Sequence, residues 1–361
     1  MAKKLAFDKL LFTVVIVLLG VGLTMVFSAS SALARDRHDG PNPYLFKQAG
    51  AAAVGLVGMW LVMHLDYRRL RQMPAAYFSL FAVLALLVLA LFQPALNGTR
   101  RWVFVGGMSL QPSELAKIAV VLYVAYQVAR HEERAHVYEL LVPCTVAVGA
   151  LAGLIVMQPD LGTAGVVALV GATMLFLAGI PWRFFAGGLA ALAPLVYLAV
   201  RLEPYRWQRV TAFLDPERHL LGAGFQADQS LVAVGSGGIL GLGLGDSVQK
   251  LYYLPHPESD FIYSIVAEEL GLVGAAILLA LFAVLLWRGV RAGLKAPDLF
   301  GRHLAWGLTT VLVAQALIHV SVALSLVPTT GIPLPFISAG GSSLVSTLVA
   351  CGLLLNVSQH A

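Results

Sequence analysis

Long apolar segments recur along the whole chain and dominate its pattern of hydrophobic and polar positions. Each is close to the ~20 residues that a helix needs to cross a hydrocarbon core of ~30 Å. Inside lipid only helices and closed barrels pair all of their backbone polar groups. Barrel strands alternate apolar and polar residues, whereas these segments are continuously apolar. The pattern therefore predicts transmembrane helices.

Ten helices follow from this pattern, and they indicate an all-α, polytopic membrane protein. The chain is expected to form a single membrane domain over residues 1–361, with one large extracytoplasmic loop over residues 201–259. The expected helices cover residues 10–30, 44–65, 74–92, 112–128, 138–157, 163–179, 184–200, 260–287, 303–326 and 340–357.

Composition agrees with a membrane protein and narrows the function classes. Of the 361 residues 59% are hydrophobic and 12% are charged, against roughly 25% charged in a soluble domain. The first apolar segment is longer than the core of a signal peptide, so we expect a retained helix. Cys144 and Cys351 lie in apolar segments and indicate buried small residues rather than a disulfide. The sequence contains no P-loop, which argues against ATP hydrolysis by this chain, and nothing indicates nucleic-acid binding.

The distribution of lysine and arginine predicts the orientation. Loops on the side of the N-terminus hold most of these residues, and short loops on the other side hold few. The positive-inside rule therefore places both termini in the cytoplasm and the 201–259 loop outside. The cytoplasmic set is Lys3, Lys4, Lys9, Arg68, Arg69, Arg71, Arg130, Arg134, Arg183, Arg288, Arg291, Lys295 and Arg302.

Two acidic positions next to apolar helices stand out, because charges in membrane helices are costly and often functional. Glu114 and Lys117 share one helix face and can pair, either only to fix that helix or with Lys117 also facing an anionic ligand. Asp260 follows Pro255 and Pro257 at the start of an apolar segment, where it is either a helix cap or an outward functional carboxylate. Deeper in the same segment, one of the adjacent glutamates 268 and 269 is expected to pair inside the bundle or to face a polar cavity.

A second group is cationic and is expected near the outer surface. Arginine forks match phosphate oxygens, so these residues are candidate pyrophosphate ligands, although anchoring to lipid headgroups is the alternative. The group comprises Arg101, Arg206, Arg209 and Lys250.

Irregular outer segments are predicted to line a cavity, because irregular backbone at membrane depth must be shielded from lipid. Residues 328–343 are rich in Pro, Gly and Ser, and residues 235–245 predict a turn or re-entrant hairpin packed against a helix. Asp160 is either a cavity residue or only the cap of the next helix. The expected cavity-lining residues are Asp160, Gln226, Ser338, Gly340, Gly341 and Ser342. These features suit an enzyme acting on a lipid phosphate or a transporter of an anionic amphiphile.

Eleven stretches, spread over essentially the whole chain, resemble the SEDS family of cell-wall polymerases, which includes FtsW, RodA and SpoVE. Their joint order and spacing carry the resemblance. The stretches are 27–31 (FSASS), 64–68 (HLDYR), 97–102 (NGTRRW), 111–117 (QPSELAK), 158–163 (QPDLGT), 206–216, 224–226, 249–255 (QKLYYLP), 259–262 (SDFI), 268–271 (EELG) and 333–343 (PLPFISAGGSS).

Two details refine the resemblance. Residues 243–250 (GLGDSVQK) look like the division and sporulation members rather than the elongation member RodA. The family pattern ahead of Asp260 reads Pro-Glu-x-His/Gln-Thr-Asp, whereas this chain has His256 and Glu258 with the imidazole and acid exchanged. Asp260 itself matches the pattern, and the exchange puts roles for His256 and Glu258 in doubt.

The resemblance implies a peptidoglycan glycosyltransferase that polymerises lipid II during division, with Asp260 as general base and Glu114 and Lys117 in support. It implies membrane lipid, a class B penicillin-binding protein and other divisome proteins as partners, in the bacterial cytoplasmic membrane. No cofactor or side-chain metal site is predicted, and a divalent cation, Mg²⁺ or Mn²⁺, is the family-based alternative. The competing functions are a lipid II flippase, a RodA-type elongation polymerase and a non-enzymatic scaffold.

Overall fold

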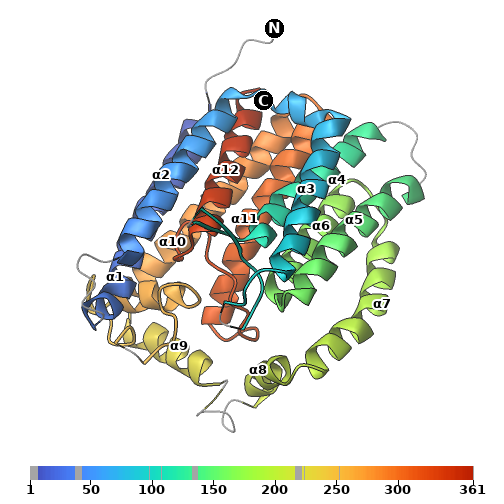
Figure 1. The fold of residues 1–361 in the computed structure, drawn as a ribbon. Coiled ribbons are helices and arrows are strands. Elements are labelled where there is room, and N and C mark those ends of the chain that lie inside the picture. The colour runs from blue at the N-terminus through green and yellow to red at the C-terminus, as the bar shows by residue number, and fades with distance from the viewer. Residues whose placement is uncertain are drawn as a thin grey trace.

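Helices make up nearly all regular secondary structure in the computed structural model (Figure 1). The structure describes residues 7–36, 43–96, 98–106, 108–131, 137–215, 222, 224–251 and 253–360. Three residues of the motif stretches, Asn97, Pro216 and Tyr252, lie outside this part of the chain.

The elements follow the predicted order. The helices are α1 (Lys9–Asp36), α2 (Pro43–His64), η1 (Tyr67–Arg71), α3 (Met73–Leu91), α4 (Pro112–Arg130), α5 (Val137–Met157), α6 (Leu161–Leu177), α7 (Trp182–Arg201), α8 (Pro204–Leu214), α9 (Phe225–Ser236), α10 (Ile262–Lys295), α11 (Leu299–Ala323) and α12 (Gly341–Ser358). A short antiparallel hairpin of β1 (Val103–Val105) and β2 (Met108–Leu110) separates α3 from α4. The sequence pattern did not predict this hairpin, nor α8 and α9 within the 201–259 loop.

Eight of the described helices are long and apolar enough to cross a membrane. The expected ten spans correspond to these eight together with α6, which has 17 residues, and α4, which carries charged side chains. The chain is therefore a multi-pass membrane protein of the all-α class, as the pattern predicted.

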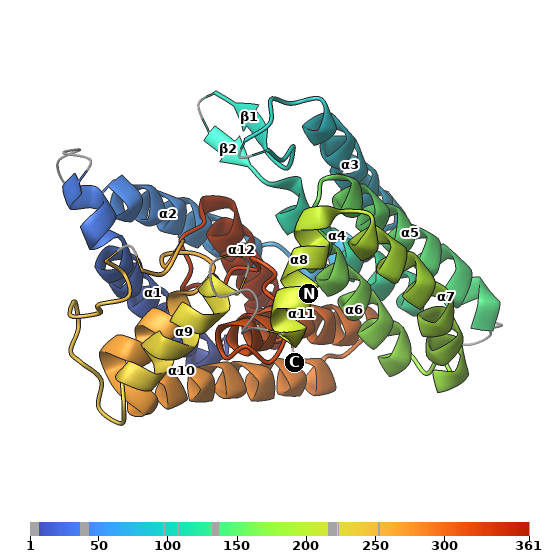
Figure 2. The ribbon, with the colours of Figure 1, turned by 90° about the horizontal axis from the view of Figure 1, so that it is seen from below.

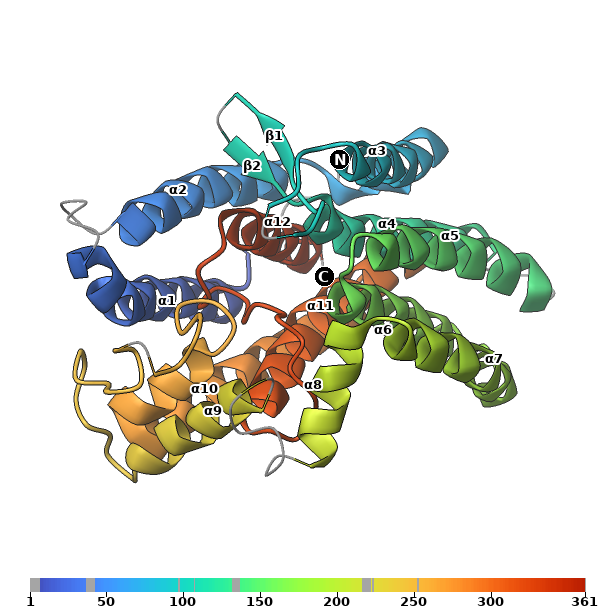
Figure 3. The ribbon, with the colours of Figure 1, turned by 60° about the horizontal axis from the view of Figure 1, so that its bottom comes forward.

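Three helices form the centre of the bundle. Residues on nearly every side of α4, α11 and α12 are buried, and α2 packs along α12 while α10 packs along α11. In contrast, α7 stands at the outer edge and has no buried residue (Figures 2 and 3). Aromatic pairs at its two ends, Tyr138 with Phe184 and Tyr197 with Trp207, connect it to α5 and α8.

The end of the bundle that carries both chain termini is held by buried polar contacts. The Tyr67 hydroxyl donates to Asp298 at 2.6 Å, and burial together with this bond raises the pKa of the hydroxyl above its ordinary value. Asn356 in α12 donates to the carbonyls of Val62 (2.7 Å) and of two neighbouring residues at the end of α2. Arg288 donates from Nε to Asp8 at 2.7 Å. These contacts, which we call the terminal clasp, join α1, α2, α10, α11 and α12.

At the opposite end, the chain between α11 and α12 enters the bundle as predicted. Leu334, Phe336 and Ile337 are at most 2% exposed. A Cβ on Gly22 of α1 would lie 2.1 Å from the Phe336 carbonyl oxygen, so this close contact requires glycine at position 22. Gln48 of α2 donates to the Ser338 carbonyl at 3.0 Å. We call residues 328–340 the re-entrant loop.

The glycine-rich stretch after α9 packs against a break in α10, as the hairpin prediction required. The α10 backbone leaves helical geometry at Gly271 (φ 65°). Leu242 and Gly243 donate backbone hydrogen bonds to the carbonyls of Glu268 and Glu269, each at 3.0 Å. The hairpin therefore satisfies carbonyls near the break, where the helical bonding pattern is interrupted.

Candidate active site

Asp260 lies directly before α10, at the end of the bundle away from the termini. The N-cap of α10 is Phe261, so the alternative that Asp260 is an ordinary helix cap is wrong. Its backbone N–H donates to the His256 carbonyl at 3.1 Å, and the Ser259 hydroxyl donates to its Oδ1 at 3.0 Å. The residue is half-buried, which leaves part of the carboxylate accessible to a reactant.

The re-entrant loop holds the backbone on both sides of this carboxylate. The Ser338 hydroxyl donates to the Ser259 carbonyl at 2.6 Å, and the Ala339 N–H donates to the Glu258 carbonyl at 2.8 Å. Gly331 adopts φ 73°, and a Cβ at this position would lie 3.4 Å from the Asp260 Oδ2. The loop therefore contacts Asp260 directly and fixes the segment that leads into it.

Three of the predicted cationic residues are half-buried and bind backbone carbonyls, Arg101 and Arg209 those of loops and Arg206 that of a helix. Arg101 donates from Nε to the Gln158 carbonyl at 2.8 Å and lies 3.8 Å from Asp160. Arg206 of α8 donates to the Ala199 carbonyl at 3.0 Å. Arg209 of α8 donates to the Thr329 carbonyl at 2.9 Å, and its guanidinium stacks on Tyr205.

Two of these arginines bind segments that contact each other beside Asp260. A Cβ on Gly162 would lie 2.9 Å from the Ile332 side chain and 3.3 Å from the Thr330 carbonyl oxygen. The loop held by Arg101 therefore packs on the loop held by Arg209, two residues before Gly331. Each guanidinium has N–H groups beyond those used on carbonyls, which can donate to an anionic group.

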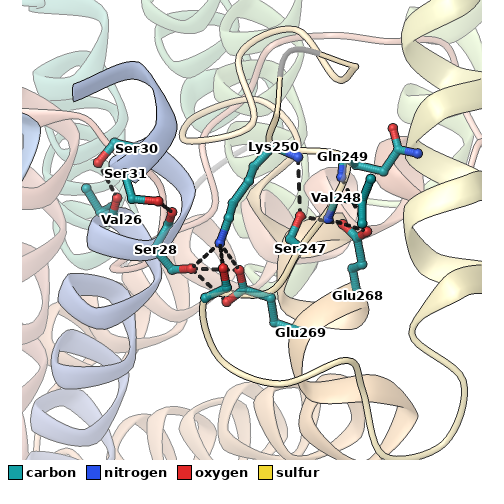
Figure 4. Close-up of polar contacts among 11 residues, drawn as sticks. Val26, Ser28, Ser30, Ser31, Ser247, Val248, Gln249, Lys250, Glu268 and Glu269 are labelled. Atoms are coloured by element: carbon teal, nitrogen blue, oxygen red, sulfur yellow. Dashed lines mark hydrogen bonds and ion pairs between the residues drawn. The ribbon is translucent and has the colours of Figure 1, made fainter. Parts of the chain in front are cut away.

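Lys250 does not lie at the outer surface as the sequence predicted. Its side chain is 3% exposed, and its ammonium group lies 2.8 Å from Glu269 Oε1 and 3.1 Å from the Ser28 hydroxyl (Figure 4). Ser28 donates to the same carboxylate at 2.6 Å. A lysine inside the bundle loses hydration, and only a close carboxylate compensates for that loss. The pair connects α1 to the segment that leads to Asp260.

Glu268 points away from this pair and binds the backbone of the same segment (Figure 4). Its carboxylate accepts from the Ser247 hydroxyl, from the Val248 N–H at 3.0 Å and from the Gln249 N–H at 3.3 Å. Glu269 therefore pairs within the bundle, as expected of one of the two glutamates, and Glu268 binds neutral donors there as well.

Glu114 and Lys117 form a buried ion pair of 2.7 Å in the first turns of α4. Ser346 of α12 also donates to Glu114 at 3.2 Å, so the pair joins two central helices. The lysine is 2% exposed. This geometry agrees with a structural role for the pair, and contact of Lys117 with an anionic ligand stays a prediction.

The residues predicted to line a cavity lie at the end of the bundle that carries Asp260. Most of them form hydrogen bonds or packing contacts with neighbouring elements. Asp160 caps α6 by accepting from the Thr163 N–H at 3.1 Å, so the cap alternative is confirmed. Gly340 donates to Gln48 at 3.0 Å, Ser342 donates to the Ser109 carbonyl at 3.0 Å, and Gly341 packs on α2. Gln226 is half-buried in the first turn of α9. Their role in lining a cavity stays a prediction.

Sequence reasoning missed the residues that fix the re-entrant loop. Gln48 lies in a span of α2 where a single polar residue carries no distinguishing pattern. His319 of α11 was equally unmarked, although an imidazole within an apolar segment is a signal of the kind that buried polar groups give. Among the described residues, no group of three or more His, Cys, Asp or Glu side chains could hold a metal ion.

Comparisons with known proteins agree with this architecture. The FtsW/RodA/SpoVE family model, described as "Cell cycle protein", matches residues 8–361. The chain is 40% identical over 362 residues to stage V sporulation protein E of Bacillus subtilis, covering 99% of each chain. It is 41% identical over 361 residues to the probable peptidoglycan glycosyltransferase FtsW of Geobacter metallireducens, covering 98% of this chain and 95% of that one.

Solved structures show the same fold. One similar chain comes from a peptidoglycan synthase complex that was solved in work on the structural coordination of polymerization and crosslinking. It matches with a TM-score of 0.81 and 34% identity, and the match covers 98% of both chains. The rod shape determining protein RodA of Thermus thermophilus matches with a TM-score of 0.72 and 31% identity, covering 98% of this chain and 97% of that one.

The buried Lys250–Glu269 pair leads to a stability prediction. Glu269→Gln strands a buried ammonium group, and we expect it to lower the free energy of unfolding by about 3–5 kcal/mol. Glu268→Gln is the matched control. It should lower the free energy of unfolding less, because the Glu268 carboxylate accepts from the neutral donors Ser247, Val248 and Gln249. Adding Lys250→Met to Glu269→Gln should recover most of the stability. Thermal unfolding in detergent measures all four proteins, and equal losses in the two single variants would contradict the prediction.

Proposed function

The chain belongs to the FtsW/RodA/SpoVE family of cell cycle proteins, and we propose from this membership that it is a peptidoglycan glycosyltransferase that polymerises lipid II. The observation that carries the proposal is the placement of Asp260. Its half-buried carboxylate lies between the re-entrant loop and the start of α10, at the end of the bundle where the arginines gather. A reactive lipid headgroup needs a base and cations within one accessible region, and this end provides both.

Asp260 acts as the general base in this proposal. The nucleophile is the 4-hydroxyl of N-acetylglucosamine, and the electrophile is the anomeric carbon of N-acetylmuramic acid on undecaprenyl pyrophosphate. Conversion of an α-linked donor to a β-1,4 product inverts the anomeric carbon, so a single displacement needs one base and no protein nucleophile. Oδ2 lies beside the exposed Gly331, so it can take the hydroxyl proton while Oδ1 keeps the Ser259 bond.

The leaving pyrophosphate gains negative charge and requires positive charge rather than a proton. Arg209 and Arg101 are the first candidates, because both are half-buried and bind carbonyls of loops that pack beside Asp260. Arg206 is the third, from the same helix as Arg209. Lys250 is less suitable, because Glu269 already neutralises its charge inside the bundle.

We place this site on the outer side of the bacterial cytoplasmic membrane, with both termini in the cytoplasm. The excess of lysine and arginine in loops on the terminal side supports this orientation. Lipid II presented in the outer leaflet would then have its headgroup level with Asp260 and its tail against the helices. The greater identity to proteins named FtsW and SpoVE, 40–41%, than to RodA, 31%, favours a division-type role over elongation.

The proposed partner is a class B penicillin-binding protein that cross-links the new glycan, within a group of divisome membrane proteins. The similar chain from a complex that coordinates polymerization and crosslinking supports a transpeptidase partner. A polymerase and a transpeptidase held together would cross-link strands as they emerge.

Among the described residues, no three His, Cys, Asp or Glu side chains lie close enough together to hold a divalent cation by themselves. Mg²⁺ in phosphate-handling sites is bound by one or two carboxylates together with substrate phosphates. We therefore propose that any Mg²⁺ or Mn²⁺ used by this protein arrives with the pyrophosphate of lipid II.

The assignment of the base predicts the effect of Asp260→Asn. This substitution keeps the shape of the side chain and removes its proton affinity, so we expect loss of glycan synthesis with unchanged folding. The measurement is glycan-chain formation from pure lipid II by detergent-purified protein, with and without the cognate transpeptidase. Asp246→Asn, which alters an exposed carboxylate of the same loop, is the matched control and should keep full activity.

Two outcomes would contradict the proposed base or the proposed function. Polymer from the Asp260→Asn variant would remove Asp260 as the base. Lack of polymer from the wild type with its partner, combined with transfer of lipid II across liposome membranes, would favour a flippase instead.

The role of Arg209 gives a separate prediction. Arg209→Ala removes a fork that can bind phosphate oxygens, so kcat/KM for lipid II should fall roughly 10- to 150-fold, as for the loss of one charged hydrogen bond of about 1.5–3 kcal/mol. Arg201→Ala at the exposed end of α7 is the control, and its KM should stay at the wild-type value. Lipid II titrations measure kcat and KM for both variants, and wild-type values of both constants for Arg209→Ala would exclude contact with the substrate.

The metal proposal predicts a difference between the free protein and the reaction. Substrate-free protein is first dialysed against EDTA and then returned to buffer that contains micromolar Mn²⁺ or Mg²⁺. Elemental analysis should then find less than one equivalent of the ion bound to the protein. Isothermal titration with Mn²⁺ should show tight binding only when lipid II is present. Stoichiometric binding of the ion to the protein alone would contradict the proposal, because it would show that side chains form a resident metal site without lipid II.

A further inference from the structure

A buried imidazole lies next to the re-entrant loop and has only one of its two nitrogens paired. His319 of α11 is 1% exposed. Its Nδ1 lies 2.8 Å from the Ile332 carbonyl oxygen, and a carbonyl can only accept, so Nδ1 carries the proton. Nε2 has no hydrogen-bond partner among the described residues. A buried nitrogen without a partner lowers the stability of the fold. Stability alone therefore does not explain a histidine at this position.

The carbonyl that His319 binds belongs to the residue next to the one that contacts Asp260. Gly331 lies against the Asp260 carboxylate, with a Cβ position 3.4 Å from Oδ2, and it is held at φ 73°. Ile332 follows it in the chain and is packed from the other side by the first turn of α6 at Gly162. The hydrogen bond from His319 therefore holds the Ile332–Pro333 peptide, which directly follows the Gly331–Ile332 peptide beside the carboxylate.

We propose that His319 is a positioning residue for Asp260, through its Nδ1–H bond to the Ile332 carbonyl. The inference rests on the proposed function and extends it. Without the bond, the Gly331–Ile332 segment is free to move relative to Oδ2, and the orientation of the base toward the acceptor hydroxyl loosens. Displacement of a catalytic group by about 1 Å can cost on the order of 100-fold in rate.

The two nitrogens can be separated by substitution. An asparagine amide can place a donor near the position of Nδ1, a glutamine amide places one near Nε2, and leucine has neither. His319→Asn should therefore retain a kcat within about threefold of the wild type. His319→Gln and His319→Leu should lose roughly 10–100-fold in kcat, with the KM for lipid II within about twofold of the wild type.

The measurement is steady-state glycan synthesis by the purified full-length protein with its transpeptidase, normalised to folded protein by size exclusion and thermal unfolding. Val320→Ala on the same helix controls for loss of buried volume and should keep the wild-type kcat, although its unfolding temperature falls. Gly331→Ala should reproduce the kcat loss of His319→Leu, because its Cβ alters the same contact.

The outcomes are distinct. Equal kcat for the Asn and Leu variants would overturn the positioning role, as would a loss that appears only in KM or that Val320→Ala reproduces at matched stability. Rescue by Asn alone, with the loss confined to kcat, would establish it. Absence of polymer from the wild type would overturn the proposed function and this inference with it, whereas a normal wild type beside a fully active His319→Leu overturns the inference alone.

Discussion

The requirement that every backbone polar group be paired inside the hydrocarbon region governs the rest of this structure. The chain leaves helical geometry within the bundle at the α10 break and in the re-entrant loop, and in both places another segment supplies the missing partners. At the α10 break, Leu242 and Gly243 donate to carbonyls of that helix. In the re-entrant loop, Gln48 of α2 donates to the Ser338 carbonyl and accepts from the Gly340 N–H. Both irregular segments adjoin the chain leading to Asp260, so the pairing that permits them also orients the candidate base.

The same requirement governs the charged side chains. Two buried lysines are paired, Lys117 with Glu114 and Lys250 with Glu269, because an isolated ammonium group in the bundle would be too costly, and the buried Glu268 accepts hydrogen bonds from neutral donors. Asp260 differs from the paired carboxylates, since within the described part of the chain its side chain bonds to the neutral hydroxyl of Ser259 and forms no ion pair. A carboxylate with no bound cation keeps its capacity to accept a proton, whereas a carboxylate in a salt bridge holds its charge more strongly. The arginines stand one loop away, where they can meet phosphate without neutralising the base.

Sequence reasoning recovered what depends on local pattern and missed what depends on distant contacts. Continuous hydropathy located the ten helices, and glycine and proline content located both irregular segments. Resemblance marked Asp260 as the candidate base. The burial of Lys250 was not predictable, because its partners Ser28 and Glu269 come from other parts of the chain. His319 was missed for the same reason, since only the fold brings Ile332 to its Nδ1. The helices α8 and α9 have 11 and 12 residues, which is too short for the continuous apolar segments that located the other helices.

The two ends of the bundle are built differently, and this asymmetry bears on the choice between polymerase and transporter. At the terminal end, the clasp joins five helices through buried contacts of Tyr67, Asn356 and Asp8. At the other end, loops and short helices surround the candidate base, and α7 has no buried residue. An alternating-access carrier must open at both ends by rocking one part of the bundle against another. Opening the terminal end would break several buried hydrogen bonds at once, each of which leaves an unpaired polar group costing about 1–3 kcal/mol. A protein that works only from the end that carries Asp260 needs no such opening, and the clasp then serves as the fixed base against which the loops of that end hold Asp260.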